Sequence, residues 1–158
     1  MSKAQSPLKR LTRELQDLQD EPNDAVLRLG PVDDDLFHWH AVLKGPAGTA
    51  YEGGLWALSI TIPPNYPNAP PKVRFETPIC HPNVHFQTGE ICLDLLKDKW
   101  APTITISILL TSIQQLLTSA EPDSPLNVDI AQLFRQGDWA GAESLIRYYT
   151  QVERWDGR

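Results

Sequence analysis

The chain lacks several features that define other classes of protein. No stretch of its 158 residues has the roughly 18 consecutive apolar residues that a membrane-spanning helix needs, so we expect no direct membrane insertion. The residues that follow Met1 contain no apolar core, and we expect no signal peptide there. A glycine-rich phosphate-binding loop followed by a Lys-Ser or Lys-Thr pair is also absent.

Cysteine and positive charge are scarce. Two cysteines, Cys80 and Cys92, are too few for a disulfide framework, and we expect free thiols. Together with His81 they have no recognisable zinc-ligand spacing, so no metal site is expected. The 14 Lys and Arg residues against 20 Asp and Glu residues give a net charge of −6, which disfavours nucleic acid as the main partner. A local basic face remains compatible with this total.

The remaining composition is that of one globular domain. Hydrophobic residues make up 41% of the chain and charged residues 22%, and the length allows a sizeable core. We find no internal repeat and no linker, and therefore expect residues 1–158 to form a single domain.

The first half of the chain changes from a helical to a strand-like pattern. Apolar residues three and four apart predict an amphipathic helix over residues 6–20, with Ser6 as its cap and Pro7 at its first position. Alternating apolar residues then predict four short strands, separated by glycine and proline turns that include Gly30-Pro31. The strands are expected near residues 26–29, 36–44, 55–62 and 73–75. Their tight links indicate an antiparallel meander.

The second half returns to a helical pattern. Thr105 is expected to cap a central, largely buried helix, and residues 120–126 a rigid turn. A further helix should open at Asn127 and stop at Gly137, and Asp138 should cap the last one. The last helix is expected to carry three residues inward: Trp139, Ile146 and Tyr149. These elements predict an α+β fold.

Between the strands and the central helix, residues 80–92 read Cys-His-Pro-Asn-Val-His-Phe-Gln-Thr-Gly-Glu-Ile-Cys. Pro82 fixes its own backbone angle and biases His81 toward an extended conformation. The neutral amide of Asn83 suits hydrogen bonding to a backbone group or to an oxyanion, although an isolated asparagine is commonly just a turn residue. The segment therefore combines a constrained backbone with a reactive thiol, Cys92.

Five sequence landmarks recur in an order and spacing that resemble the ubiquitin-conjugating enzyme family. They are Tyr66-Pro67-x-x-Pro70-Pro71, His81-Pro82-Asn83, Ile91-Cys92-Leu93-Asp94, Trp100-x-Pro102 and Asp123-Ser124-Pro125-Leu126. The resemblance extends from about Lys9 to Tyr149. Residues 77–90 and 121–127 are most similar to the peroxisomal branch.

The resemblance implies an N-terminal helix, a four-stranded antiparallel meander, an active-site loop and three C-terminal helices. It also implies that Cys92 accepts ubiquitin as a thioester from the activating enzyme and passes it, with a RING-type ligase, to a substrate. In the peroxisomal branch the acceptor is a cysteine of an import receptor, and a membrane-anchored peroxin tethers the enzyme to the cytosolic face of the peroxisome. ATP is used upstream, so no cofactor is expected.

Three alternatives remain open. The chain could be a general cytosolic ubiquitin-conjugating enzyme, a catalytically silent ubiquitin-binding scaffold, or an enzyme for a different ubiquitin-like modifier. Silent scaffolds commonly lack the cysteine or the asparagine, and both Cys92 and Asn83 are present. The context of Asp94 favours ubiquitin as the modifier.

The resemblance also suggests roles for other residues. Asn83 would stabilise or organise the developing oxyanion, and His81 would lock the turn, with general-base action the less favoured role. Ser124 stands where many relatives have an acidic residue, and a hydroxyl is a poor base. Leu93 and Leu126 would shape the groove for the ubiquitin tail, or serve packing only.

Two surfaces are implied for partner proteins. Lys9 and Arg10 stand where basic residues meet the activating enzyme, although such charges are commonly just a solvated helix face. The ligase surface would comprise Pro67, Asn68, Ala69, Pro70, Ala101 and Pro102. Many general-purpose relatives carry a bulky aromatic residue at the position of Asn68. Cys80 replaces a tyrosine of many relatives and is expected to be a small packing residue, or else an oxidisable partner of Cys92.

Overall fold

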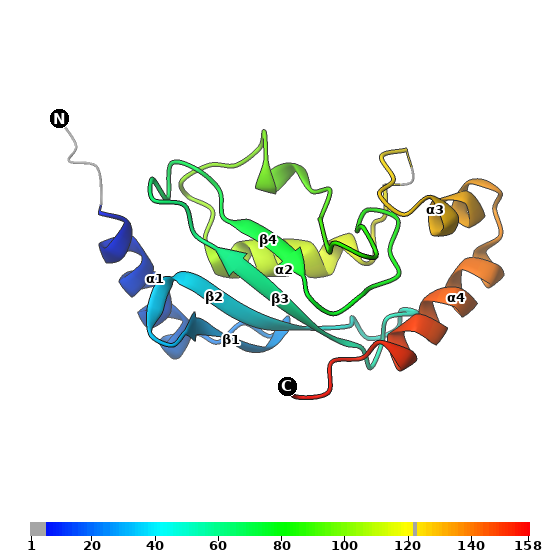
Figure 1. The fold of residues 1–158 in the computed structure, drawn as a ribbon, viewed down its shortest axis with the longest axis horizontal. Coiled ribbons are helices and arrows are strands. Elements are labelled where there is room, and N and C mark those ends of the chain that lie inside the picture. The colour runs from blue at the N-terminus through cyan, green and yellow to red at the C-terminus, as the bar shows by residue number, and fades with distance from the viewer. Residues whose placement is uncertain (1–5, 122) are drawn as a thin grey trace.

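The computed structural model describes residues 6–121 and 123–158. The elements, in chain order, are α1 (Pro7–Asp20), β1 (Val26–Val32), β2 (Asp35–Lys44), β3 (Leu55–Thr61), β4 (Lys72–Phe75), a 3₁₀ turn η1 (Asp94–Leu96), α2 (Ile106–Leu116), α3 (Val128–Arg135) and α4 (Trp139–Val152) (Figure 1). The expected α+β fold is confirmed. Residues 1–5, where we expect no signal peptide, and Pro122 of the expected turn lie outside the described residues.

The four strands form one antiparallel sheet in the order β1-β2-β3-β4, so the predicted meander is confirmed. One boundary prediction was wrong: β1 does not stop before Gly30-Pro31 but continues to Val32, with Pro31 opposite Trp39. A proline is tolerated there because β1 is an edge strand, on which the missing N–H need not face a neighbouring strand.

The main core lies between the sheet and α2, which crosses behind the sheet in Figure 1. The helical spacing of Ile106, Leu109, Leu110 and Ile113 places all four side chains in the buried interior. The predicted cap is confirmed, because the Thr105 hydroxyl accepts a hydrogen bond from the backbone N–H of Ile108 at 3.1 Å. The helix therefore has a fixed start and a buried face.

Helix α1 is attached to the rest of the molecule through the buried carboxylate of Glu14, which is 5% exposed. One oxygen accepts hydrogen bonds from Arg10 Nε at 3.0 Å and from the Tyr66 hydroxyl, and the other accepts from the Ile106 backbone N–H at 2.7 Å. Pro7 is the first helical residue as predicted, but the expected Ser6 side-chain cap is not formed. Helix α1 is thus held by tertiary contacts of its middle turns rather than by a side-chain cap.

Helices α3 and α4 extend toward one end of the molecule (Figure 1). The predicted caps Asn127 and Asp138 are confirmed, and each accepts a bond from a backbone N–H three residues later. Ile146 is buried, but the expectation that Trp139 points inward was wrong, because it is 62% exposed. Trp139 begins the first turn of α4, beyond the main core, and packs edge-on against Phe134 of α3 at 5.3 Å between ring centres.

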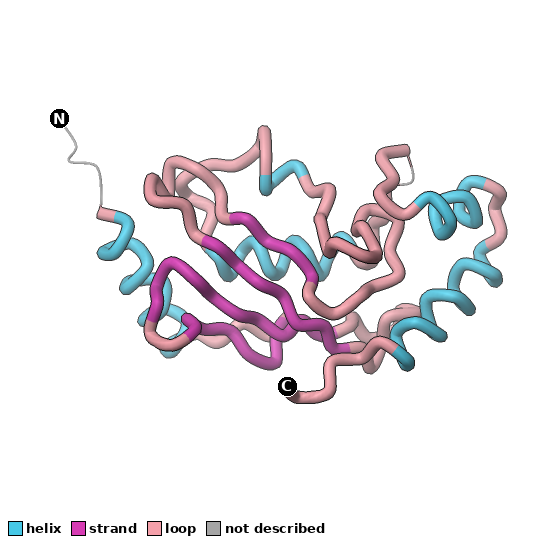
Figure 2. Tube along the Cα trace, in the orientation of Figure 1, coloured by secondary structure: helices cyan, strands magenta, loops and turns pink. Residues whose placement is uncertain are grey.

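Between β4 and α2 the chain is irregular apart from η1. Figure 2 shows these loops beside the β4 edge of the sheet, to the right of β4 and above it. The loop of residues 80–92, called the active-site loop below, approaches β4 closely at Gly89. The φ of Gly89 is +76°, and a Cβ there would lie 1.8 Å from the Phe75 carbonyl oxygen. The Phe75 backbone N–H donates to the Gly89 carbonyl at 2.9 Å, which holds the loop against the sheet.

Candidate active site

His81 anchors the loop to the C-terminal end of α2. Its Nε2–H donates to the Leu116 carbonyl at 2.7 Å, and its Nδ1 accepts from the backbone N–H of Asn83 at 3.0 Å. Burial lowers the pKa of His81 from 6.5 to about 4, although the bond to the Leu116 carbonyl opposes the shift. The ring is therefore neutral with both nitrogens occupied, which fits a structural lock and leaves no nitrogen free to act as a base.

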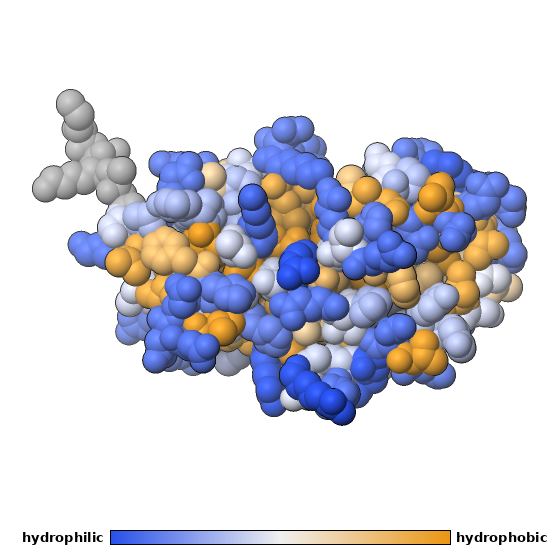
Figure 3. Space-filling view, in the orientation of Figure 1, coloured by the Kyte–Doolittle hydropathy of each residue, from blue (hydrophilic) through white to orange (hydrophobic). Residues whose placement is uncertain are grey.

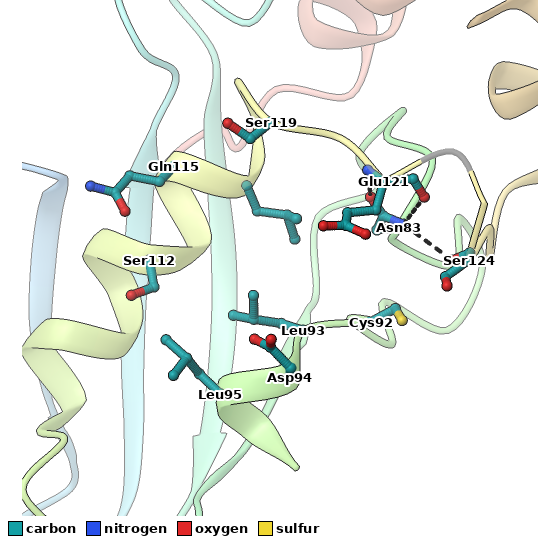
Figure 4. Close-up of a pocket in the computed structure, with 11 residues that line it drawn as sticks. Asn83, Cys92, Leu93, Asp94, Leu95, Ser112, Gln115, Ser119, Glu121 and Ser124 are labelled. Carbon is teal, nitrogen blue, oxygen red and sulfur yellow. Dashed lines mark hydrogen bonds between the residues drawn. The ribbon is translucent and has the colours of Figure 1, made fainter. Parts of the chain in front are cut away.

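The side chain of Asn83 holds the segment that follows α2. Its Oδ1 accepts from the Glu121 backbone N–H at 2.7 Å, while its Nδ2 donates to the carbonyls of Glu121 at 2.8 Å and Ser124 at 3.1 Å. Both amide hydrogens are thus used on backbone carbonyls (Figure 4). Asn83 was expected to form hydrogen bonds with a backbone group or with an oxyanion. The structure contains hydrogen bonds with backbone groups.

The backbone of the same triplet connects the cysteine to this segment. The Asn83 carbonyl accepts from the Cys92 N–H at 2.8 Å, and the Pro82 carbonyl accepts from the N–H groups of Leu126 at 2.8 Å and Asn127 at 3.1 Å. A buried backbone polar group without a partner is costly, so these bonds define the path of the loop. His81-Pro82-Asn83 is therefore the junction that places Cys92 beside residues 121–127.

Cys92 opens onto a groove of ≈ 440 Å³ that runs toward α2. Its lining consists of Asn83, Cys92, Leu93, Asp94, Leu95, Ser112, Gln115, Leu116, Ser119, Glu121 and Ser124. In Figure 4, Cys92 and Ser124 lie at one end of this groove, and Ser112 and Gln115 of α2 at the other. The groove thus leads from a partly exposed thiol along a surface of apolar, hydroxyl, amide and carboxylate side chains.

Cys80 lies in a different environment. It is 4% exposed, and burial raises the pKa of its thiol to about 12. It lines a separate hollow of ≈ 360 Å³ together with Phe86 and Leu126, whereas Leu93 lines the groove of Cys92. The structure therefore brings Leu93, but not Leu126, to that groove. It supports the packing role for Cys80, because a suppressed thiolate reacts poorly with oxidants.

The two cations expected to face the activating enzyme differ in their exposure to solvent. Lys9 is exposed, but the Arg10 side chain is only 14% exposed. Arg10 bonds Glu14 and the Ile104 carbonyl, and its guanidinium lies 5.5 Å from the centre of the Tyr66 ring. Arg10 is therefore committed to the fold, and Lys9 is the one of the pair that is available to a partner.

The two loops of the expected ligase surface lie side by side. Trp100 Nε1 donates to the Pro67 carbonyl at 2.9 Å, and the rings of Trp100 and Tyr66 are 6.0 Å apart. Asn68 and Pro102 are exposed next to this contact. The remaining residues of the expected surface are partly exposed: Pro67, Ala69, Pro70 and Ala101.

Sequence reasoning missed two residues of this architecture. Glu121 supplies two of the three backbone partners of the Asn83 side chain, and nothing in its own sequence context marks that role. Glu14 had a detectable signal, because it falls on the apolar stripe of α1 between Leu11 and Leu18. A charged residue on a buried stripe indicates a buried partner.

Within residues 6–121 and 123–158, no group of three or more His, Cys, Asp or Glu side chains is arranged to hold a metal ion. In the same part of the chain, no helix is both long and apolar enough to cross a bilayer.

Comparison with known proteins decides the family. The model of the ubiquitin-conjugating enzyme family matches residues 10–148. The chain belongs to the ubiquitin-conjugating enzyme family. Among curated relatives of this ubiquitin-conjugating enzyme, "Ubiquitin-conjugating enzyme E2 pex4" of Dictyostelium discoideum is 47% identical, over 90% of this chain and 96% of the relative. "Protein PEROXIN-4" of Arabidopsis thaliana is 46% identical, over 90% and 92% of the two chains.

Solved structures of the family have the same fold. The ubiquitin-conjugating enzyme Pex4p of H. polymorpha, crystallised in complex with the soluble domain of Pex22p, superposes with a TM-score of 0.89 at 36% identity. The superposition covers 93% of this chain and 97% of that one. An E2 domain from Toxoplasma gondii has a TM-score of 0.84 at 38% identity, over 94% and 99% of the chains.

Proposed function

We propose that this ubiquitin-conjugating enzyme carries ubiquitin on Cys92, as a thioester with the C-terminal carboxyl group of ubiquitin. The proposal depends on the contrast between the two thiols of the chain. Cys92 is partly exposed and lines a groove, whereas Cys80 is buried with a raised thiol pKa. Of the two sulfurs, that of Cys92 is the one a reactant can reach.

Charging is an exchange of one thioester for another. The Cys92 thiolate attacks the carbonyl carbon of the thioester on the activating enzyme, a new C–S bond forms, and the old C–S bond breaks to release that enzyme's cysteine as a thiolate. The exchange is nearly isoenergetic, and cysteine is intrinsically nucleophilic. No cofactor is therefore needed here, because ATP is used upstream by the activating enzyme.

The groove beside Cys92 suits an extended peptide, and we assign it to the C-terminal tail of ubiquitin. Leu93 supplies an apolar wall, while Ser112, Gln115 and Ser119 offer hydroxyl and amide groups for the backbone of the tail. Asp94 lies at the start of η1, where its exposed carboxylate pairs with Lys99 at 3.6 Å. This pair is a weak surface contact, so Asp94 remains available to an approaching partner.

Transfer reverses the bond changes at Cys92. A sulfur or nitrogen nucleophile of the acceptor attacks the thioester carbonyl, the C–S bond to Cys92 breaks, Cys92 leaves as a thiolate, and the proton of the acceptor is lost to solvent. Because both amide hydrogens of Asn83 are bonded, we assign Asn83 to organising the segment beside Cys92. A contact with the oxyanion would require one of these bonds to open. The hydroxyl of Ser124 supplies no strong base, which suits a cysteine acceptor.

We further propose a peroxisomal role with a RING-type ligase, in which the acceptor is a cysteine of an import receptor. The support is the names of the relatives, together with a solved neighbour whose partner is the soluble domain of Pex22p. A membrane-anchored peroxin would hold this enzyme at the cytosolic face of the peroxisome. Lys9 would face the activating enzyme, and the loops at Asn68 and Pro102 would face the ligase.

A charging assay tests the central proposal. The protein is mixed with ubiquitin, the activating enzyme and ATP, and is separated on gels with and without reductant. We expect a band shifted by one ubiquitin that thiol reductant removes, that Cys92→Ala abolishes and that Cys80→Ala retains. A charged Cys92→Ala protein, or a folded wild-type protein that never charges with ubiquitin, would contradict the proposal.

The peroxisomal role has a separate test in cells. A fluorescent fusion of the enzyme should colocalise with peroxisomes and become diffuse when the membrane-anchored peroxin is deleted. A diffuse distribution in cells that retain this peroxin would instead favour a general cytosolic enzyme.

A further inference from the structure

A second groove lies on the other side of η1, between this turn and β4. It has a volume of ≈ 510 Å³, and the proposed mechanism does not use it. Ile91 and Leu96 give it an apolar floor, and Val73 lines it from β4. Figure 3 shows an apolar strip with hydrophilic side chains on both sides in the region of β4 and η1. This groove could therefore contact both apolar and charged groups of a ligand.

The charges around this second groove are mostly positive. Lys72, Arg74 and Lys97 line it and are exposed, against one carboxylate, Glu90. Lys72 and Arg74 are two residues apart on β4, so both side chains point to the same face of the sheet. Within the described part of the chain, none of the three cations forms an ion pair. On a chain with a net charge of −6, this is a local basic surface.

The position of the second groove connects it to the reaction. Its floor residue Ile91 is the covalent neighbour of Cys92, and its Thr88 and Glu90 belong to the active-site loop. It shares no lining residue with the groove assigned to the ubiquitin tail. With the tail lying along α2, a chain that presents its nucleophile to Cys92 can place its neighbouring residues here.

We infer that this second groove binds an acidic segment of the acceptor protein, adjacent to the residue that receives ubiquitin. The inference rests on the proposed role of Cys92. Three cations complement two or three carboxylates, and the apolar floor accommodates an aliphatic side chain between them. An extended segment advances about 3.3 Å per residue, so a few residues suffice to cross the groove. Acceptor selection is then partly encoded in the enzyme itself, beside the contribution of the ligase.

The test measures discharge of the purified, ubiquitin-charged enzyme to two synthetic peptides. Each peptide has one cysteine as acceptor; in the first it is flanked by Asp and Glu, and in the second by Asn and Gln. Rates are measured for the wild type, for the double variant Lys72→Gln/Arg74→Gln and for Lys97→Gln. The control is Arg147→Gln, which removes an exposed cation on α4 away from the groove. Thermal denaturation verifies that each variant is folded.

We expect the ratio of the acidic-peptide rate to the neutral-peptide rate to fall about 3- to 10-fold in the double variant, as for the loss of two solvent-exposed ion pairs. Lys97→Gln should lower the ratio by about 2-fold on the same basis, and Arg147→Gln should not change it. Using this ratio cancels the intrinsic difference in reactivity between the two peptide thiols. Added salt should also lower the wild-type ratio, because exposed charges are screened.

Two results would overturn the inference. One is an unchanged ratio in the folded double variant and in Lys97→Gln. The other is an equal loss toward both peptides, which would assign the cations to a different partner. The preceding charging step separates this inference from the proposed function. A protein that cannot be charged with ubiquitin would contradict both. A charged protein that discharges to free cysteine but does not prefer the acidic peptide would contradict only the inference about the second groove.

Discussion

Asn83 and Glu121 are joined by a reciprocal pair of hydrogen bonds. The Asn83 Oδ1 accepts from the Glu121 N–H at 2.7 Å, and the Asn83 Nδ2 donates to the Glu121 carbonyl at 2.8 Å. The second Nδ2 hydrogen is directed to the Ser124 carbonyl. A side chain of the active-site loop thus forms hydrogen bonds with the backbone of a residue 38 positions later in the chain.

This arrangement predicts how Asn83 variants differ. Asn83→Ala should lower the free energy of unfolding by about 1–3 kcal/mol, because three backbone groups lose a partner. Asn83→Asp should cost at least as much, since a carboxylate would face the two carbonyls that the amide donates to. Urea denaturation measures stability, and single-turnover discharge measures transfer. Two variants with wild-type stability and equally slow discharge would instead indicate that Asn83 acts only on the oxyanion.

The environment of His81 predicts a loss of stability in mild acid. Its pKa falls from 6.5 to about 4 on folding, so below pH 6.5 the unfolded chain binds a proton that the native ring does not. This contribution is complete above pH 6.5, decreases as the pH falls, and levels off near pH 4. Between pH 7.5 and pH 5 the loss should be about 2 kcal/mol.

NMR provides the direct measurement for His81. Its ring resonances should remain those of the neutral form between pH 8 and pH 5.5. A midpoint near pH 6.5 would show that the ring is not locked between Leu116 and Asn83.

The buried carboxylate of Glu14 predicts a large effect far from the thiol. Glu14→Ala should destabilise the protein by about 3–5 kcal/mol, because Arg10 would remain as a partly buried cation without its partner and the Ile106 N–H would lose its acceptor. Chemical denaturation tests this, with Arg13→Ala on the exposed face of α1 as the matched control. A loss below 1 kcal/mol would show that Glu14 does not connect α1 to α2.

Ser124 predicts a shift in acceptor preference. Ser124→Asp places a carboxylate beside Cys92, where it can accept a proton from an incoming amine. The rate of discharge to free lysine should rise relative to the rate with free cysteine, by about 100-fold or more if the new group acts as a general base. Both rates can be followed on gels from the same charged sample. An unchanged ratio of the two rates would show that Ser124 does not determine the preference between lysine and cysteine acceptors.

The two cysteines should react very differently with alkylating agents. Iodoacetamide at neutral pH should modify Cys92 in the native protein and leave Cys80 unmodified, because burial raises the pKa of Cys80 to about 12. Peptide mass spectrometry identifies the site, and denatured protein serves as the control in which both react. A Cys80–Cys92 cross-linked peptide after mild peroxide treatment would instead support the alternative role of Cys80 as an oxidisable partner of Cys92.

Much of the fold could be predicted because its signals are local. The caps Thr105, Asn127 and Asp138 act on backbone groups three residues away, and the strand alternation of residues 36–44 needs only the period of an extended chain. Local rules failed where packing overrode them. Pro31 sits inside a strand because that strand is at the sheet edge, and Trp139 is exposed because its turn of α4 lies beyond the main core.

The sequence by itself determined the order of the elements, the family pattern around Cys92 and the identity of the chemically competent groups. The tertiary structure alone decided which of those groups are free to act. Arg10 is occupied by Glu14 and Ile104, and Cys80 is buried while Cys92 is not. The physical reason is distance along the chain: helix periods and caps involve residues within one turn, whereas burial and these hydrogen bonds join segments that meet only when the core has formed.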